Sequence, residues 1–224
     1  MPSAHTKSRL GSRGKPEETR AAILQAAVRE FAQAGISGAR TDTIAQAAGV
    51  NKALLYYYFQ DKETLYGAAL DHSLSQLSAQ MMEVLHRQLP PREMITTYVG
   101  AYFDFIAGHP FYRNLMQREM LRAAYGSPHM PRLAKRYFNP LSAKLAEVIH
   151  AGIASGDFRK VDPMHFVPSM VALVIFYFAS APVMKAVSGV DPLSSERLAE
   201  RRAAVLDFVS AALFRRVESA GGRQ

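Results

Sequence analysis

The sequence predicts an all-α protein of about nine helices, and three observations support this class. Apolar residues recur at three- and four-residue intervals along most of the chain, and strand-type alternation is nowhere sustained. Clusters of glycine and proline divide the chain into segments of helical length. Of the 224 residues, 49% are apolar, which is enough to build a full hydrophobic core.

Composition excludes several classes of function. Cysteine is absent, so there is no disulfide framework and no thiolate metal site, and the seven histidines are scattered without metal-binding spacing. No nucleophile with its base, phosphate loop or pair of carboxylates is evident. We therefore expect the chain not to be an enzyme and to use no metal or cofactor.

The charge is unevenly distributed. The net charge is +8, and residues 1–62 hold nine Lys and Arg against five Asp and Glu. Half of the net charge thus lies in little more than a quarter of the chain. A basic N-terminal part is compatible with binding to nucleic acid.

The first predicted helix begins at Pro16 and ends at Gly35. Proline fits the first turn of a helix, and the following Glu17 and Glu18 suit the positive end of the helix dipole. Glycine is the usual residue where a helix stops. We expect residues 1–15 to form a flexible basic arm.

Two short helices follow, and their spacing predicts a helix-turn-helix unit. Cap-type threonine and aspartate residues precede the first, over 44–48, and the second runs over 52–58. Gly49 takes the turn, where a left-handed backbone is needed. Ala45 has to be small where the two helices cross, and Leu55 returns the second helix to the core.

A fourth helix, capped by Asp61, begins the larger part of the chain. Its apolar stripe consists of Leu65, Leu70, Leu74, Leu77, Met81 and Val84. Pro140 predicts a bend near residues 136–140. Five further helical segments are predicted over about 92–107, 110–124, 131–154, 163–186 and 195–217. We place a helix-turn-helix domain at 16–62, a larger helical domain at 63–219 and a disordered tail at 220–224.

Residues 164–184 contain no Asp, Glu, Lys or Arg, and their length would suffice to cross a membrane. The segment includes His165, Pro168 and Pro182, and a buried central helix has a similar composition. We favour the buried helix and expect no membrane partner. A membrane-anchored protein that crosses the bilayer through this segment is the alternative.

Residues 40–66, RTDTIAQAAGVNKALLYYYFQDKETLY, resemble the DNA-binding region of the TetR/AcrR family of bacterial transcriptional regulators. With the first helix, the resemblance covers about residues 16–70. Ala53 and Leu54 depart from the family pattern, in which glycine or proline and a polar base-reading residue are frequent, so the operator sequence stays open. The matching residues are Thr41, Ile44, Ala45, Ala48, Gly49, Val50, Leu55, Tyr56, Tyr58, Phe59, Lys62, Glu63 and Leu65.

The resemblance implies a surface that contacts duplex DNA. Tyr56 and Tyr57 would donate to phosphates, and Lys52 would contact a phosphate or a guanine edge. Leu54 can contact a thymine methyl group. Ordinary packing of the tyrosines and a solvated lysine are the alternatives, and Tyr58 lies either at the edge of the core or near the DNA.

Further DNA contacts are predicted around this helix. Thr41 would cap the preceding helix and touch a phosphate, and Lys62 would bind one at the start of the fourth helix. The arm before Pro16 either adds contacts or is a disordered tail. The predicted DNA-binding set also includes Thr43, Asn51 and Ala53.

Members of this family dimerise through their last two long helices, so the resemblance implies a homodimer. The residues of the final helix expected at the seam are Val205, Val209, Ala212 and Leu213. The family also binds a small-molecule effector among helices 4 to 8, which releases the DNA.

Aromatic and methionine side chains in the larger domain favour an apolar or aromatic effector. The predicted function is therefore a cytoplasmic homodimeric repressor released by such a ligand, with a ligand-responsive activator as the alternative. The candidate ligand-binding residues are Phe103, Ile106, Met116, Met120, Met170 and Phe178.

Overall fold

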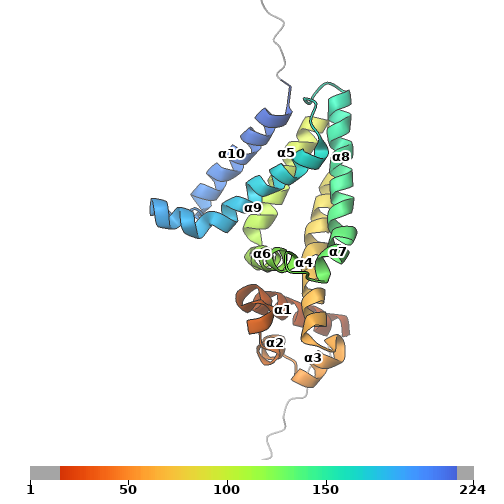
Figure 1. Cartoon of the computed structure of the whole chain (residues 1–224), viewed down its shortest axis with the longest axis vertical. Coiled ribbons are helices and arrows are strands. Elements are labelled where there is room, and N and C mark those ends of the chain that lie inside the picture. Colours follow the sequence, from red (N-terminus) through yellow and green to blue (C-terminus); the bar gives the residue numbers. More distant parts are fainter. Residues whose placement is uncertain (1–15, 216–224) are drawn as a thin grey trace, which may run out of the picture.

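The structure is a computed structural model that describes residues 16–215. The predicted arm at 1–15 and tail at 220–224 lie outside the described residues, as do residues 216–219. The described chain is all-α, which confirms the predicted fold class. Figure 1 shows a small head, formed by α1 to α3, at one end of a longer helical body.

The head consists of α1 (Pro16–Gly38), α2 (Thr41–Ala47) and α3 (Lys52–Phe59). Gly35 adopts φ 67° and ψ 176° and interrupts α1 where the sequence predicts its end, and the chain then adds a last short helical stretch. The three helices meet through fully buried apolar side chains, among them Ile23, Phe31, Ile44 and Leu55.

The turn between α2 and α3 confirms the predicted roles of its small residues. Gly49 has φ 70°, and no atom lies within 4 Å of the position that a Cβ would occupy there. Glycine is therefore needed for its backbone conformation and not for space. Ala45 is 3% exposed, and its carbonyl accepts a hydrogen bond from Val50 N at 3.0 Å.

The long helix α4 (Lys62–Leu85) joins the head to the body (Figure 1). Asp61 caps it as predicted, since its Oδ1 accepts a hydrogen bond from Thr64 N at 2.7 Å. The predicted apolar stripe of this helix is buried throughout. One continuous helix thus carries core residues of both parts of the molecule.

The body continues with α5 (Pro91–Gly108), α6 (Pro110–Ala123) and α7 (His129–Leu133). A π-helical segment, Ala134–Phe138, then precedes α8 (Asn139–Ala154). A π-helical hydrogen bond from Asn139 N to the carbonyl of Ala134, five residues back, lies just before Pro140, where the sequence predicts a bend.

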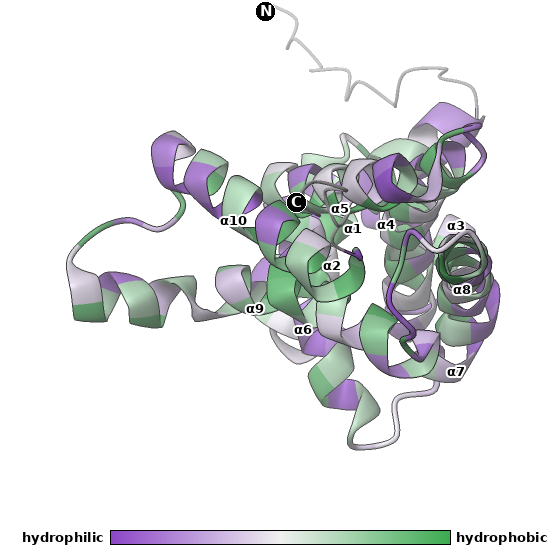
Figure 2. Cartoon of the chain, turned by 90° about the horizontal axis from the view of Figure 1, so that it is seen from above, coloured by the Kyte–Doolittle hydropathy of each residue, from purple (hydrophilic) through white to green (hydrophobic). Residues whose placement is uncertain are grey.

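Two long helices complete the fold, α9 (Pro163–Ser188) and α10 (Ser195–Leu213). The prediction that α9 is buried is wrong for the single chain, because residues 182–188 are all exposed. In Figures 1 and 2 the far ends of α9 and α10 project away from the body. The predicted end of the last helix near 217 is also wrong. Phe214 turns extended, with ψ 141°, and pairs with Phe158.

Candidate nucleic-acid interface

The recognition helix α3 has one buried side. Leu55 and Phe59 are 0% and 2% exposed and anchor α3 to the head. Tyr57 is 80% exposed, and Tyr58 packs partly against the core. Four consecutive aromatic residues are therefore divided between the core and the surface, and Tyr57 is left free to contact another molecule.

Asn51 and Lys52 hold the start of α3 in two different ways. The side-chain Oδ1 of Asn51 accepts a hydrogen bond from Leu54 N at 2.8 Å and so caps the helix. Lys52 Nζ lies 3.0 Å from Asp42 Oδ1 of α2, and both side chains are more than half exposed. The ammonium group is therefore accessible, but a carboxylate neutralises it in the free protein.

Tyr56 and Thr41 join α3 to α2. Their hydroxyl oxygens are 3.2 Å apart, and Thr41 is only 9% exposed. The prediction that Thr41 caps α2 is wrong, because the capping residue is Arg40 and no side chain completes the cap. The N–H of Arg40 instead donates to Glu30 Oε1 at 3.0 Å. The Thr41 hydroxyl therefore orients Tyr56.

The other predicted DNA-binding residues border this surface. Thr43 and Ala53 are exposed, and Leu54 is half-buried. Lys62 is the first residue of α4, and its Nζ donates to the carbonyl of Ser37 at 3.3 Å. All nine predicted residues lie on α2, on α3 with its capping residue, or at the start of α4.

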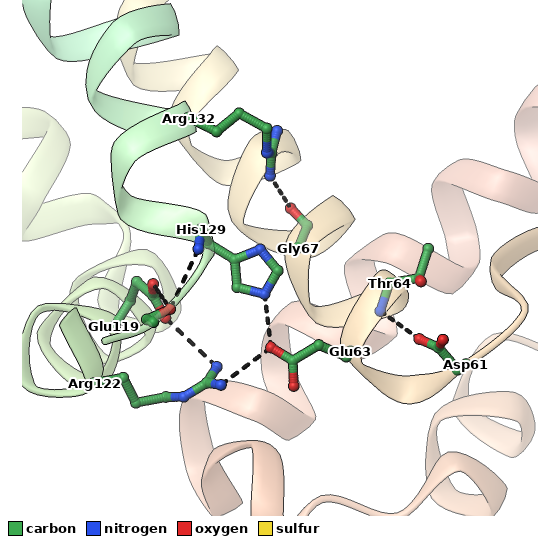
Figure 3. A network of polar contacts seen from close by, with 9 residues as sticks. Asp61, Glu63, Thr64, Gly67, Glu119, Arg122, His129 and Arg132 are labelled. Atoms are coloured by element: carbon green, nitrogen blue, oxygen red, sulfur yellow. Dashed lines mark hydrogen bonds and ion pairs between the residues drawn. The ribbon is translucent and has the colours of Figure 1, made fainter. Parts of the chain in front are cut away.

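A polar network joins the head to the body, and the sequence did not predict it (Figure 3). Glu63 Oε1 lies 2.8 Å from His129 Nε2 and 3.1 Å from Arg122 Nη2. Arg122 also approaches the fully buried Glu119, whose Oε1 accepts a hydrogen bond from Ser127. The partners of Glu63 lie 59 and 66 residues away in the chain, so periodicity carries no sign of them.

This network affects the ionisation of its members. Burial opposes ionisation of Glu63, but hydrogen bonds from Arg122 and His129 outweigh burial and hold its pKa below the ordinary 4.5. Burial, together with the carboxylate of Glu119, raises the pKa of Tyr66 to about 12. The network therefore contains an ionised Glu63 carboxylate and a neutral Tyr66 phenol at neutral pH.

A second link holds the C-terminal end of α1. Arg118 of α6 donates from Nε to the carbonyl of Ala32 at 3.1 Å and from Nη2 to that of Gln33 at 2.8 Å. These carbonyls lie just before the break at Gly35, where intrahelical donors run out. Movement of α6 would therefore displace the C-terminal end of α1, which belongs to the head.

The predicted ligand-binding residues have different environments. Phe103 and Phe178 pack together with ring centroids 5.4 Å apart, and three of the others are also buried in the hydrophobic core: Ile106, Met116 and Met170. The prediction that Met120 lines an interior ligand site is wrong, because this side chain is 61% exposed. The inner side of α6 carries Leu115, Met116 and Glu119 instead.

The projecting helices expose apolar side chains. On α9, Phe176, Val183 and Val187 are 71%, 64% and 84% exposed, and on α10 Phe208 is 62% exposed. The prediction that Val205, Val209 and Leu213 form the dimer seam is wrong, because these side chains are buried within their own chain. An apolar surface of this kind marks an interaction site. By length and composition α9 alone among the described helices could also cross a membrane.

A helix-turn-helix head with an exposed recognition helix, joined to a helical body, defines a DNA-binding regulator. Residues 23–69 match the family described as bacterial regulatory proteins, tetR family, and residues 91–209 match the tetracyclin repressor-like C-terminal domain. The chain therefore belongs to the TetR family of transcriptional regulators. The members of this family bind DNA operators and small-molecule effectors and are not enzymes.

Individual relatives agree with this assignment. The chain is 32% identical to the HTH-type transcriptional regulator RutR of Escherichia coli K12 over 171 residues, or 75% of this chain and 77% of RutR. It is 35% identical over 121 residues to the HTH-type transcriptional repressor SCO4008 of Streptomyces coelicolor, or 54% of this chain and 58% of SCO4008.

A solved structure shows the same fold. A protein described as a transcriptional regulator from Saccharomonospora viridis, in complex with choline, superposes with a TM-score of 0.73. The match covers 89% of this chain and 100% of that protein, at 20% identity. At this identity the likeness concerns the fold alone.

Proposed function

We propose that this chain is a cytoplasmic homodimeric repressor that binds its operator through α3 of each copy and is released by a small apolar or aromatic ligand. The observation that carries the proposal is the two-sided environment of α3. Leu55 and Phe59 fix the helix to the head, and its opposite side presents Lys52 and Tyr57 to solvent. Because α3 lies at the end of the molecule remote from most of the body, DNA can reach it (Figure 1).

Operator binding is tested with the purified chain and duplex DNA from the promoter region beside its own gene. Selective binding over a scrambled duplex, with affinity falling steeply as salt rises, is expected because phosphate contacts release counterions. Weak and equal binding to both duplexes in every salt concentration would reject this promoter as the operator. Equal binding to a panel of genomic fragments would reject sequence-specific binding.

The homodimer is supported by the exposed apolar side chains of α9 and α10. Within residues 16–215, Phe176 and Val187 on α9 and Phe208 on α10 are mostly exposed, and a second copy would bury them. Two heads in one dimer would read half-sites about 34 Å apart.

The dimer is tested by measuring the mass of the protein in solution without detergent. Phe208→Glu should convert a dimer to a monomer, because it places a charge in an apolar interface. Tyr125→Glu is the matched control, since Tyr125 is 91% exposed on a turn outside α9 and α10. A monomeric parent protein would contradict the proposal. A requirement for detergent would favour the membrane-anchored alternative through α9.

The proposed ligand site is the interior around Phe103, Met170 and Phe178. The two aromatic rings pack together there, and the flexible Met170 is buried in the same hydrophobic core, which suits an adaptable apolar site. Apolar and aromatic compounds are screened for release of bound operator, and a hit should lose its effect in Phe103→Ala but keep it in the surface variant Met120→Ala. Release by charged hydrophilic compounds alone would contradict the proposed ligand class.

Repression is supported by the name of the relative SCO4008, which is a repressor. A reporter gene placed behind the operator should be silenced by the chain and restored by the ligand. Increased expression on adding the chain would identify an activator.

A further inference from the structure

A cleft of about 390 Å³ opens where the head meets the body. Its wall comes from three places: α1 with Gln25, Val28 and Arg29, α4 with His72, Ser73 and Gln76, and the junction of α5 and α6 over 108–112. None of the predicted ligand-binding residues lines it. The cleft is therefore separate from the proposed interior site.

The polar lining of this cleft favours an anion. Arg29 is exposed and forms no ion pair with any residue that the structure describes, and the lining contains no aspartate or glutamate. Ser73 is only 3% exposed and lines the same wall, so its hydroxyl can donate a hydrogen bond to a molecule bound in the cleft.

Two further groups add to this positive character. The cleft borders the first turn of α6, where the N–H groups of Phe111 and Tyr112 have no intrahelical acceptor and the helix dipole is positive. Gln76 supplies an amide from α4, and its Nε2 lies 3.4 Å from His72 Nε2. Donors from α1, α4 and α6 therefore converge on one space.

The apolar lining limits the shape of the ligand. Val28, Pro110, Phe111 and Tyr112 cover part of the wall, and the volume is at the lower end of the range for small-molecule sites. An inorganic anion would leave this apolar surface uncovered. A carboxylate attached to a flat or aliphatic group would satisfy both parts of the wall.

We infer that the cleft between α1, α4 and α6 binds a small carboxylate with an apolar body. Arg29 pairs with the carboxylate, the Ser73 hydroxyl and the Gln76 amide donate hydrogen bonds, and the apolar group rests on Val28 and Phe111. Carboxylate binding to this cleft requires neither DNA nor the proposed interior effector. Its failure in an experiment is therefore distinguishable from failure of operator binding or of the interior site.

The test uses 2-naphthoate as the probe and isothermal titration calorimetry on the full chain without DNA. Its neutral isostere 2-naphthamide is the ligand control. We expect one 2-naphthoate per chain and at least about tenfold weaker binding of the amide, because only the carboxylate forms a charge-assisted pair.

Variants locate the site. Arg29→Gln should weaken binding of 2-naphthoate by about tenfold or more, and Ser73→Ala should weaken it by a smaller factor. Arg87→Gln is the matched control, because it removes the same charge from an exposed arginine that follows the end of α4 and lines a different cleft. Circular dichroism checks that each variant is folded.

Four results would overturn the inference. The first is the absence of 2-naphthoate binding at millimolar concentration, and the second is equal affinity for the acid and the amide. The third is binding that survives both Arg29→Gln and Ser73→Ala, which would place the probe elsewhere, for example in the interior around Phe103. Loss of binding in Arg87→Gln but not in Arg29→Gln would likewise assign the anion to the other cleft.

Discussion

Removal of the Lys52 side chain should weaken operator binding with little effect on folding. In the free protein the ammonium group pairs with Asp42 at 3.0 Å, but both side chains are more than half exposed. Such a pair stabilises a fold by about 0.2–1 kcal/mol. A contact to a base is worth about 1–3 kcal/mol, so Lys52→Ala should weaken operator binding by roughly 5- to 150-fold. If Lys52 contacts only a phosphate, the salt slope should fall by about one unit.

The partner of Lys52 gives a prediction of opposite sign. Asp42 competes with DNA for the ammonium group and places a negative charge beside the phosphates. Asp42→Asn should therefore tighten operator binding by about 0.2–1 kcal/mol at low salt, and the gain should shrink as salt rises.

Both changes are measured by fluorescence anisotropy with a labelled operator across a salt series. Lys144→Ala is the control, because it breaks a similarly exposed pair, Lys144 with Glu147, on α8 of the body. Unchanged affinity and salt slope in Lys52→Ala would remove Lys52 from the interface. Weaker binding by Asp42→Asn would refute the competition, since the carboxylate would then be needed to orient the lysine.

Three other changes test the head, the body and their junction. Tyr56→Phe removes the hydroxyl that meets Thr41 and should lower operator affinity while the melting temperature changes little; an unfolded variant would instead make Tyr56 a core residue. Gly152→Ala should lower the free energy of unfolding by about 1–3 kcal/mol, because a Cβ there would lie 2.2 Å from the ring of the buried Phe158; an unchanged urea midpoint would contradict this packing. Glu63→Gln should reduce the loss of stability on acidification below pH 4.5. A carboxylate whose pKa is lowered in the folded state stabilises the protein above its ordinary pKa, and this stabilisation is lost as the pH falls through the folded-state pKa. Equal pH profiles of the melting temperature in the variant and the parent protein would refute this prediction.

Local rules were sufficient for most of the head, although they wrongly made Thr41 the cap of α2. Gly49 and Ala45 are defined by the backbone and space requirements of one turn, and Asp61 by the needs of a helix end. Each of these positions depends on residues within a few places in the chain. The helix-turn-helix and its exposed surface could therefore be predicted.

Contacts between distant segments could not be predicted in this way. Glu63 meets His129 and Arg122, and Arg118 holds the end of α1, but nothing near these residues in sequence points to their partners. Periodicity also failed on α9, which is apolar almost all round, so the sequence does not distinguish sides that face the body from sides that face solvent. On α10, the valines chosen for the partner proved to be the ones that face their own chain.

The length of α4 has a mechanical consequence. Its 24 residues form a single rod of about 36 Å, and its N-terminal end belongs to the packed head. A tilt of only about 5° about the far end would swing the head by roughly 3 Å. In the proposed dimer, opposite tilts would change the spacing between the two recognition helices by about 6 Å, which is close to two base-pair steps of about 3.4 Å. A rotation too small to disturb the core could therefore put both heads out of phase with the groove.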